Sequence, residues 1–106
     1  MSAEQASEPD VRFRKMVRSD LDSVLRIEEE CFERPWTRKT FWQWLSTPEV
    51  KGELLLCGDR LVGFVLWTIE PGQLHVLNLA VRKSEWRKGY GSLLVERAHR
   101  AAVDAG

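Results

Sequence analysis

Two glycines around a tyrosine, Gly89-Tyr90-Gly91, stand where an apolar run and a basic loop lead into an expected helix. The first turn of a helix carries unpaired backbone N–H groups and a partial positive charge, so it attracts anions. Glycine lets a ligand approach the backbone closely and adopts dihedral angles closed to other residues. The loop adds four cations, Arg82, Lys83, Arg87 and Lys88. The spacing therefore predicts a diphosphate-binding turn made by Arg87, Lys88, Gly89, Tyr90, Gly91 and Ser92.

This turn does not match the two common nucleotide-binding motifs. A Rossmann fingerprint needs three glycines and an acidic residue well downstream. A Walker loop needs Gly-Lys-Ser/Thr after the turn, whereas Gly91 is followed by Ser92 and Leu93. Recognisable base- or metal-binding residues are also missing, which argues against a generic nucleotide binder. On its own, the Gly-x-Gly pattern is also compatible with an ordinary tight turn.

With its surroundings, the turn resembles the acetyl-CoA motif of the GCN5-related N-acetyltransferases: an apolar strand, then Arg/Gln-x-x-Gly-x-Gly/Ala, then a helix. Within that family the chain is most similar to the ribosomal-protein alanine N-acetyltransferase branch. The range 31–41 resembles its Phe-x-x-Pro-Trp-Ser/Thr-x-x-x-Phe segment, and the range 75–81 resembles its central strand. The resemblance is collinear from Val11 to Gly106. One position departs from the pattern, because Trp86 stands where the family has Arg or Gln and Arg87 follows one place later.

The resemblance implies the cofactor half of a site for acetyl-CoA. In the family, a bulge splays the strand before the loop, so that free backbone groups bind the pantetheine arm. Here that role would fall on Leu79, Ala80 and Val81. The acceptor amine is expected between the 32–41 segment and the strand, where the candidate contacts are Phe32, Trp36 and Asn78. Trp36 is equally suited to the core, and Asn78 to satisfying a buried backbone group.

The catalytic residues remain unknown from the sequence. The family takes its general acid, a tyrosine, and often its base from segments after the Gly-x-Gly helix, and this chain stops at Gly106 before them. His75 is a candidate base because histidine titrates near neutral pH, although a strand histidine also serves structural roles. Glu33 is a second candidate and follows the acids Glu28, Glu29 and Glu30. Such a run either grips an ammonium group or forms a solvated face, and we favour the solvated face.

The composition is that of one ordinary globular domain. The chain has 106 residues, 43% hydrophobic and 30% charged, and 16 Lys+Arg balance 16 Asp+Glu. This neutral balance predicts no nucleic-acid partner, and no apolar run approaches the about 20 residues of a membrane span. The spacing of Cys31, Cys57, His75 and His99 predicts no metal site. We expect a cytoplasmic protein with buried thiols, a disordered tail over residues 1–10 and one domain over residues 11–106.

Apolar periodicity and turn signals predict the order strand, two helices, three-strand meander, helix. Strands are expected at 11–16, 52–57, 60–70 and 73–81, with turns at Gly58-Asp59 and Pro71-Gly72. Helices are expected from Ser19, after a cap at Thr37, and over 90–105 with Gly106 as C-cap. In the first helix one face is shared by Leu21, Val24, Leu25, Glu28 and Phe32, with Ile27 and Cys31 beside it. In the last helix the inward residues are expected to be Leu93, Leu94, Ala98, Ala101, Ala102 and Ala105. The order predicts an α+β fold with helices covering a mostly antiparallel sheet, which the resemblance identifies as the acyl-CoA N-acyltransferase fold without its C-terminal part.

Two functions are compatible with these features. The first is an N-acetyltransferase that moves an acetyl group from acetyl-CoA to a protein N-terminal α-amine, of the ribosomal-protein alanine type, or to a small amine. The alternative is a non-catalytic acyl-CoA-binding or interaction module, either a truncated remnant or one part of a split enzyme. The apolar strand at 77–81 is expected to be a bare sheet edge. We therefore expect marginal stability, self-association and little activity from the 106-residue chain alone.

Overall fold

The computed structural model describes residues 10–105, so most of the expected tail (1–10) and the expected cap Gly106 lie outside the described residues. Within 10–105, four strands form one antiparallel sheet in chain order: β1 (Val11–Lys15), β2 (Val50–Cys57), β3 (Arg60–Glu70) and β4 (Gln73–Val81). The β2–β3 and β3–β4 connections are the expected two-residue turns, with Gly58 at φ 62° and Gly72 at φ 76°. Because glycine adopts positive φ without strain, these turns fix the strand ends that the sequence predicts.

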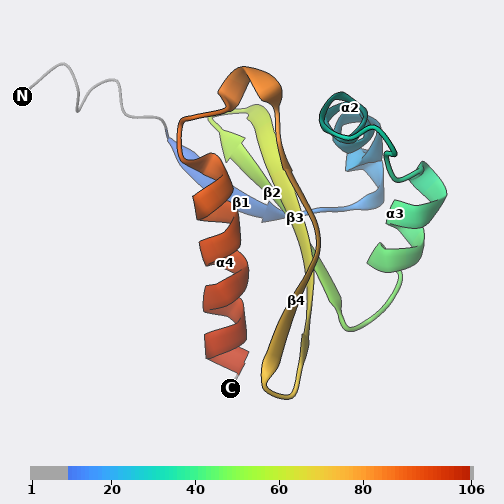
Figure 1. The fold of residues 1–106 in the computed structure, drawn as a ribbon, viewed down its shortest axis with the longest axis vertical. Helices are drawn as coiled ribbons and strands as arrows, with labels where there is room; N and C mark the ends of the chain where they lie inside the picture. The colour runs from blue at the N-terminus through green and yellow to red at the C-terminus, as the bar shows by residue number, and fades with distance from the viewer. Residues whose placement is uncertain (1–9, 106) are drawn as a thin grey trace, which may run out of the picture.

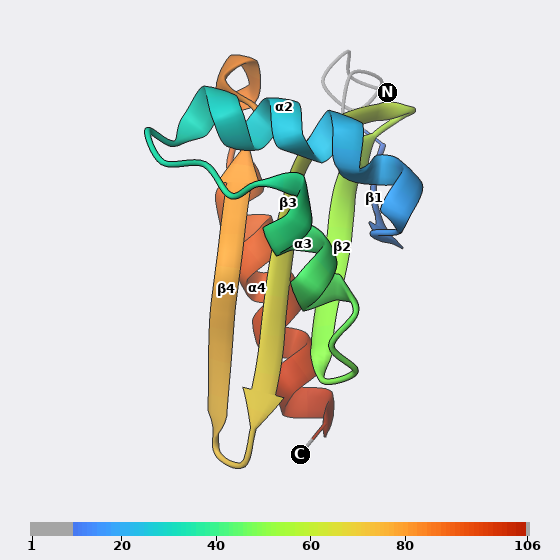
Figure 2. The same ribbon diagram turned by 90° about the vertical axis from the view of Figure 1, so that its right-hand side faces the viewer.

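Helices cover both faces of the sheet, as Figures 1 and 2 show. One face carries α2 (Leu21–Cys31) and α3 (Arg38–Leu45), and the other carries α4 (Tyr90–Ala105). Two short 3-10 turns, η1 (Arg18–Asp20) and η2 (Lys83–Glu85), precede α2 and α4. A separate apolar cluster fills the space under each helical layer. The expected α+β fold is therefore confirmed, and β4 has β3 as its only strand neighbour among residues 10–105.

The start of α2 corrects the sequence-based expectation, because the α-helix begins at Leu21 rather than at Ser19. Asp20 stands at the N-cap position but makes no side-chain bond to α2; its carboxylate instead accepts hydrogen bonds from the Val17 N–H at 2.8 Å and from Arg14 at 2.9 Å. Burial by itself raises the pKa of Asp20, but the hydrogen bonds from Arg14 and Val17 and the Arg14 charge outweigh it and leave the pKa below its ordinary value. In contrast, Thr37 caps α3 as expected, accepting from the Thr40 N–H at 3.2 Å.

Several expected inward residues are exposed. Phe32 is 38% exposed because the backbone turns extended there, directly after α2, while Ile27 is fully buried. On α4 the buried stripe runs through Tyr90, Leu94 and Ala98, which follow the four-residue spacing of one helix face. Leu93 lies beside this stripe and is 37% exposed, and Ala105 is exposed past its end. Both cysteines are half-buried free thiols rather than buried ones.

Candidate functional site

A β-bulge interrupts β4 at its midpoint. The pairing with β3 runs Leu66 opposite Asn78 and then Trp67 opposite Val76, so Leu77 is the extra residue. A bulge turns the strand and resets which side chains face which layer. Leu77 and Ala80 pack under α2 and α3, whereas Leu79 packs under α4.

The open edge of β4 offers the backbone groups of alternate residues. Arg82 donates its N–H to Val62 on β3 at 2.8 Å, and in an antiparallel ladder such bonds recur every second residue. The N–H and C=O of Ala80 therefore face β3. The groups of Leu79 and Val81 face the open edge.

Side chains already meet two of these edge-facing groups. The Leu79 N–H donates to the Asn78 side-chain oxygen at 2.9 Å. The Val81 carbonyl accepts from the Trp86 indole N–H at 2.7 Å and from the Cys31 thiol at 3.2 Å. Trp86, the departure from the expected Arg or Gln, thus closes the loop back onto the end of β4. An incoming ligand would share or displace these contacts.

The turn before α4 combines backbone strain with open space. Arg87 adopts φ 69° and Gly89 adopts φ 85°, the left-handed region that only glycine enters freely. The first bond of α4 runs from the Leu93 N–H to the Gly89 carbonyl at 3.2 Å. The preceding N–H groups, including that of Gly91, therefore have no intrahelical partner. A Cβ added at Gly91 would meet nothing within 4 Å, so the helix start is open to a ligand.

A cleft of about 580 Å³ lies between the end of β4 and the start of α4. The predicted site residues that line it are Phe32, Leu79, Ala80, Val81, Arg87, Tyr90 and Gly91. Ser92 lines an adjoining hollow together with Leu79 and Gly91. The fold thus brings the predicted strand and the predicted turn together around one cleft.

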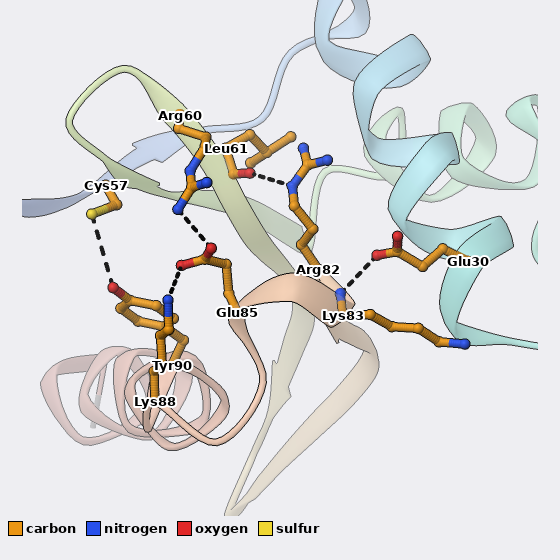
Figure 3. A network of polar contacts seen from close by, with 9 residues as sticks. All are labelled: Glu30, Cys57, Arg60, Leu61, Arg82, Lys83, Glu85, Lys88 and Tyr90. Atoms are coloured by element: carbon orange, nitrogen blue, oxygen red, sulfur yellow. Dashed lines mark hydrogen bonds and ion pairs between the residues drawn. The ribbon is translucent and has the colours of Figure 1, made fainter.

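The loop cations are partly committed to the protein itself, as Figure 3 shows. Glu85, which is only 3% exposed, pairs with Arg60 at 2.6 Å and with Lys88 at 3.3 Å. Arg82 donates from Nε to the Leu61 carbonyl at 3.0 Å. Glu85 is not among the residues predicted from the sequence, in which its one signal is an acid placed inside a basic loop. Its charge is balanced by two cations, so this part of the loop keeps a net positive charge.

The buried phenol and the thiols at the cleft are held in place by protein contacts. The Tyr90 hydroxyl contacts the Cys57 sulfur at 3.8 Å. Burial raises the pKa of Tyr90, and the Cys57 contact raises it further. Burial also raises the pKa of Cys31, with a further contribution from the Glu30 charge. Both groups therefore stay protonated at neutral pH.

The acceptor side contains a buried carboxylate. Glu28 is 2% exposed and accepts from the Trp36 backbone N–H and from the Asn78 side-chain nitrogen, both at 2.8 Å. The expected solvated face is therefore wrong for Glu28. The Trp36 ring packs edge-on against Phe41 at 5.1 Å and stacks near Trp44 at 6.5 Å, so it belongs to the packing of α3.

The two weak catalytic candidates do not line the cleft. His75 lines a separate hollow beside α3 and lies 3.5 Å from the Glu70 carboxylate. Glu33 is exposed in the segment between α2 and α3. The structure thus joins Asn78 to Glu28 near the cleft and leaves His75 and Glu33 apart from it.

Comparison with known proteins gives consistent matches. Residues 21–106 match the model of the acetyltransferase (GNAT) family. An uncharacterized N-acetyltransferase of Methanocaldococcus jannaschii is 31% identical over 86 residues, which cover 78% of this chain and 53% of that protein. The ribosomal-protein-S18-alanine N-acetyltransferase of Escherichia coli shares the fold with a TM-score of 0.82 at 21% identity, over 91% of this chain and 61% of that one. Ard1 of Thermoplasma volcanium gives a TM-score of 0.78 at 21% identity, over 89% and 64%. The chain therefore spans between half and two thirds of these relatives.

Proposed function

The chain belongs to the acetyltransferase (GNAT) family, and we propose that it binds acetyl-CoA and takes part in moving the acetyl group to an amine. The acceptor class that we propose is the α-amine of a protein N-terminus, of the ribosomal-protein alanine type. The fold shared with the E. coli enzyme for the alanine of ribosomal protein S18 supports this choice. The two free thiols fit a reducing compartment, so we propose a cytoplasmic location. Separately, no helix within residues 10–105 has the length and apolarity to cross a membrane.

One observation carries the proposal: an anion-binding helix start and an open strand edge meet in the same cleft. Acetyl-CoA supplies an acyl group activated as a thioester, and it brings a diphosphate and an amide-rich arm. The N–H groups at Gly91 and its neighbours, with Arg87 beside them, suit the diphosphate. The edge-facing groups of Leu79 and Val81 suit the amides, and the open space at Gly91 leaves room for the ligand.

Calorimetry and a thiol-release assay test this proposal. We expect coenzyme A and acetyl-CoA to bind with about micromolar affinity, since several charge–dipole contacts act together. With acetyl-CoA, a peptide that begins with a free alanine should release thiol at a low rate, as expected of the 106-residue chain alone, but above the uncatalysed rate; the same peptide with an acetylated N-terminus should not. Absence of binding would contradict the proposed cofactor. Equal thiol release with both peptides would contradict the proposed acceptor.

A specific observation favours a second function, a non-catalytic acyl-CoA-binding or interaction module. His75 and Glu33 lie apart from the cleft, and the Tyr90 hydroxyl contacts Cys57. The titratable residues that line the cleft, Cys31, Glu85 and Tyr90, each contact another protein group instead of standing free in the cleft. Tight coenzyme binding with thiol release no faster than the uncatalysed reaction would support this alternative.

A further inference from the structure

The bulge in β4 turns the side chain of Asn78 toward α2. In a regular strand, neighbouring side chains alternate between faces. Leu77 packs under α2 and α3, yet the next residue, Asn78, also reaches that side and bonds to Glu28. Alternation then resumes with Leu79 under α4 and Ala80 under α2. The extra residue therefore delivers the amide of Asn78 to a buried carboxylate.

Glu28 decides which way that amide points. A carboxylate only accepts hydrogen bonds, whereas a primary amide has a donating nitrogen and an accepting oxygen. One Glu28 oxygen is taken by the Trp36 N–H and the other by the Asn78 nitrogen, each at 2.8 Å. The Asn78 oxygen must then point away from Glu28, and it accepts from the Leu79 N–H at 2.9 Å. The opposite orientation would set the Asn78 oxygen against the Glu28 carboxylate, acceptor against acceptor, and the Asn78 nitrogen against the Leu79 N–H, donor against donor.

We propose that Glu28 is a positioning residue for the amine acceptor, acting through Asn78. It turns the Asn78 oxygen toward the open edge of β4, next to the cleft residue Leu79. This oxygen has two lone pairs and the Leu79 N–H uses one, so the second accepts a hydrogen bond from the incoming amine. The buried negative charge of Glu28 behind the amide strengthens that acceptor for an ammonium group. This inference rests on the proposed acetyl transfer to an amine.

The test reverses the amide with a single-atom change. In Glu28→Gln, the side-chain oxygen of residue 28 still accepts from the Trp36 N–H, but its nitrogen can only donate to Asn78. The Asn78 amide therefore flips to present its oxygen to residue 28. Its nitrogen then lies against the Leu79 N–H, donor against donor. In Glu28→Gln with Asn78→Asp, residue 78 accepts on both sides, from residue 28 and from Leu79. The double variant therefore restores the oxygen at the edge, with all four groups paired.

The readout is binding of a small amine to the chain saturated with coenzyme A, followed by NMR. Alanine amide is the probe, and N-acetylalanine amide, which lacks the free amine, is its control. We expect alanine amide to shift the Leu79 backbone and Asn78 side-chain signals, and the control to leave them unchanged. Glu28→Gln should weaken this binding at least about tenfold, and the double variant should recover it to within about threefold. Hydrogen exchange of the Leu79 N–H should speed up in the single variant and slow again in the double variant.

The outcomes separate this inference from the proposed function. Similar binding of alanine amide to the parent, the single variant and the double variant would overturn the inference. It would also be overturned if the double variant did not recover binding, or if N-acetylalanine amide bound as well as alanine amide. Failure of alanine amide to bind the parent would overturn it as well. Failure of coenzyme A to bind the parent would instead overturn the proposed function, and Leu79 hydrogen exchange would still report whether Glu28 sets the amide. If Glu28→Gln does not fold, Asn78→Leu removes the amide and should abolish amine binding; retained binding would refute the inference.

Discussion

Replacing Gly91 by alanine should weaken coenzyme A binding without destabilising the fold. A Cβ at this position meets nothing within 4 Å, so the protein itself does not resist the added methyl group. Gly91 lies in the first turn of α4, and alanine favours a helix over glycine by up to about 1 kcal/mol. The free energy of unfolding should therefore stay unchanged or rise. The methyl group projects into the cleft that Gly91 lines, where we place the diphosphate.

The size of the binding loss follows from the hydrogen bonds at the helix start. The N–H groups before Leu93 have no intrahelical partner and would donate to the diphosphate. A hydrogen bond to a charged group is worth about 1.5–3 kcal/mol. Displacing the anion enough to break one such bond raises Kd by about 10- to 160-fold. Valine, which is larger, should reduce binding further.

A matched pair of glycines provides the control. Gly89 and Gly72 both have positive φ, 85° and 76°, and a Cβ at either meets nothing within 4 Å. Alanine at either site should therefore lower the free energy of unfolding by a similar amount, about 1–2 kcal/mol. Gly89 belongs to the turn before α4, whereas Gly72 belongs to the β3–β4 turn. Only the Gly89 substitution should alter coenzyme binding.

Calorimetric titration with coenzyme A and urea unfolding of the same samples measure both quantities. The expected result is a raised Kd for Gly91→Ala with an unchanged midpoint of unfolding. Parent-like affinity in Gly91→Ala and Gly91→Val would refute the backbone site. Weaker binding in proportion to lost stability, with Gly72→Ala behaving like Gly89→Ala, would refute it as well.

Four further results are expected from other parts of the structure. Glu85→Gln should lower the free energy of unfolding by about 1–3 kcal/mol in urea, because Arg60 and Lys88 lose a buried partner. Cys31 in a Cys57→Ser background should react slowly with iodoacetamide near neutral pH, because its pKa is raised, and coenzyme A should slow it further. The pKa of Asp20 is lowered on folding, so its stabilisation is complete above the ordinary value and is lost as pH falls through the folded one; the stability gap to Asp20→Asn should therefore shrink below about pH 4. Val76→Lys should reduce concentration-dependent association in sedimentation runs, because Val76 is exposed on the open strand β4.

Each of these results has a contrasting outcome. Glu96→Gln removes only an exposed ion pair with Arg100 and should change stability by less than about 1 kcal/mol; an equal effect of Glu85→Gln would contradict the role of burial. Alkylation of Cys31 at an unchanged rate under saturating coenzyme A would mean that the ligand lies elsewhere. If the stability difference between the parent and Asp20→Asn did not change with pH, the lowering of the Asp20 pKa by Arg14 would be contradicted. A monomeric parent would contradict self-association.

The sequence predicts the elements well where local signals define them. The turns Gly58-Asp59 and Pro71-Gly72 and the glycine before α4 set the bounds of β3, β4 and α4, because Gly58, Gly72 and Gly89 adopt positive φ within each turn. The start of α2 is less predictable. There Ser19 lies in the 3-10 turn η1, and Asp20 in the same turn is held by Arg14, a partner on β1.

The polar core of the site could not be predicted for a similar reason. Glu28 falls on the inward face of α2 by periodicity, yet it also belongs to an acidic run, and only packing decides that it is buried. Asn78 faces α2 because of an extra residue in β4, and an apolar sequence around a bulge looks like any buried strand. Glu85 gains its burial from Arg60, which lies on a different strand.

Glu28, Glu30 and Glu85 have a shared role, because each holds other protein groups in place around the cleft. The groups offered to a ligand are backbone groups, such as the Leu79 N–H, whose chemistry is independent of side-chain identity. Three glutamates behind them fix where that backbone lies: Glu28 sets the amide beside Leu79, Glu30 accepts from the Lys83 N–H at 2.7 Å, and Glu85 gathers two cations. The contacts of Glu28 with Asn78, of Glu30 with Lys83 and of Glu85 with Arg60 join elements that are distant in the sequence. Conservative changes at Glu28 and Glu30, which do not line the cleft, should therefore alter binding geometry without removing a ligand contact, whereas changes at lining residues, Glu85 among them, should alter the contact itself.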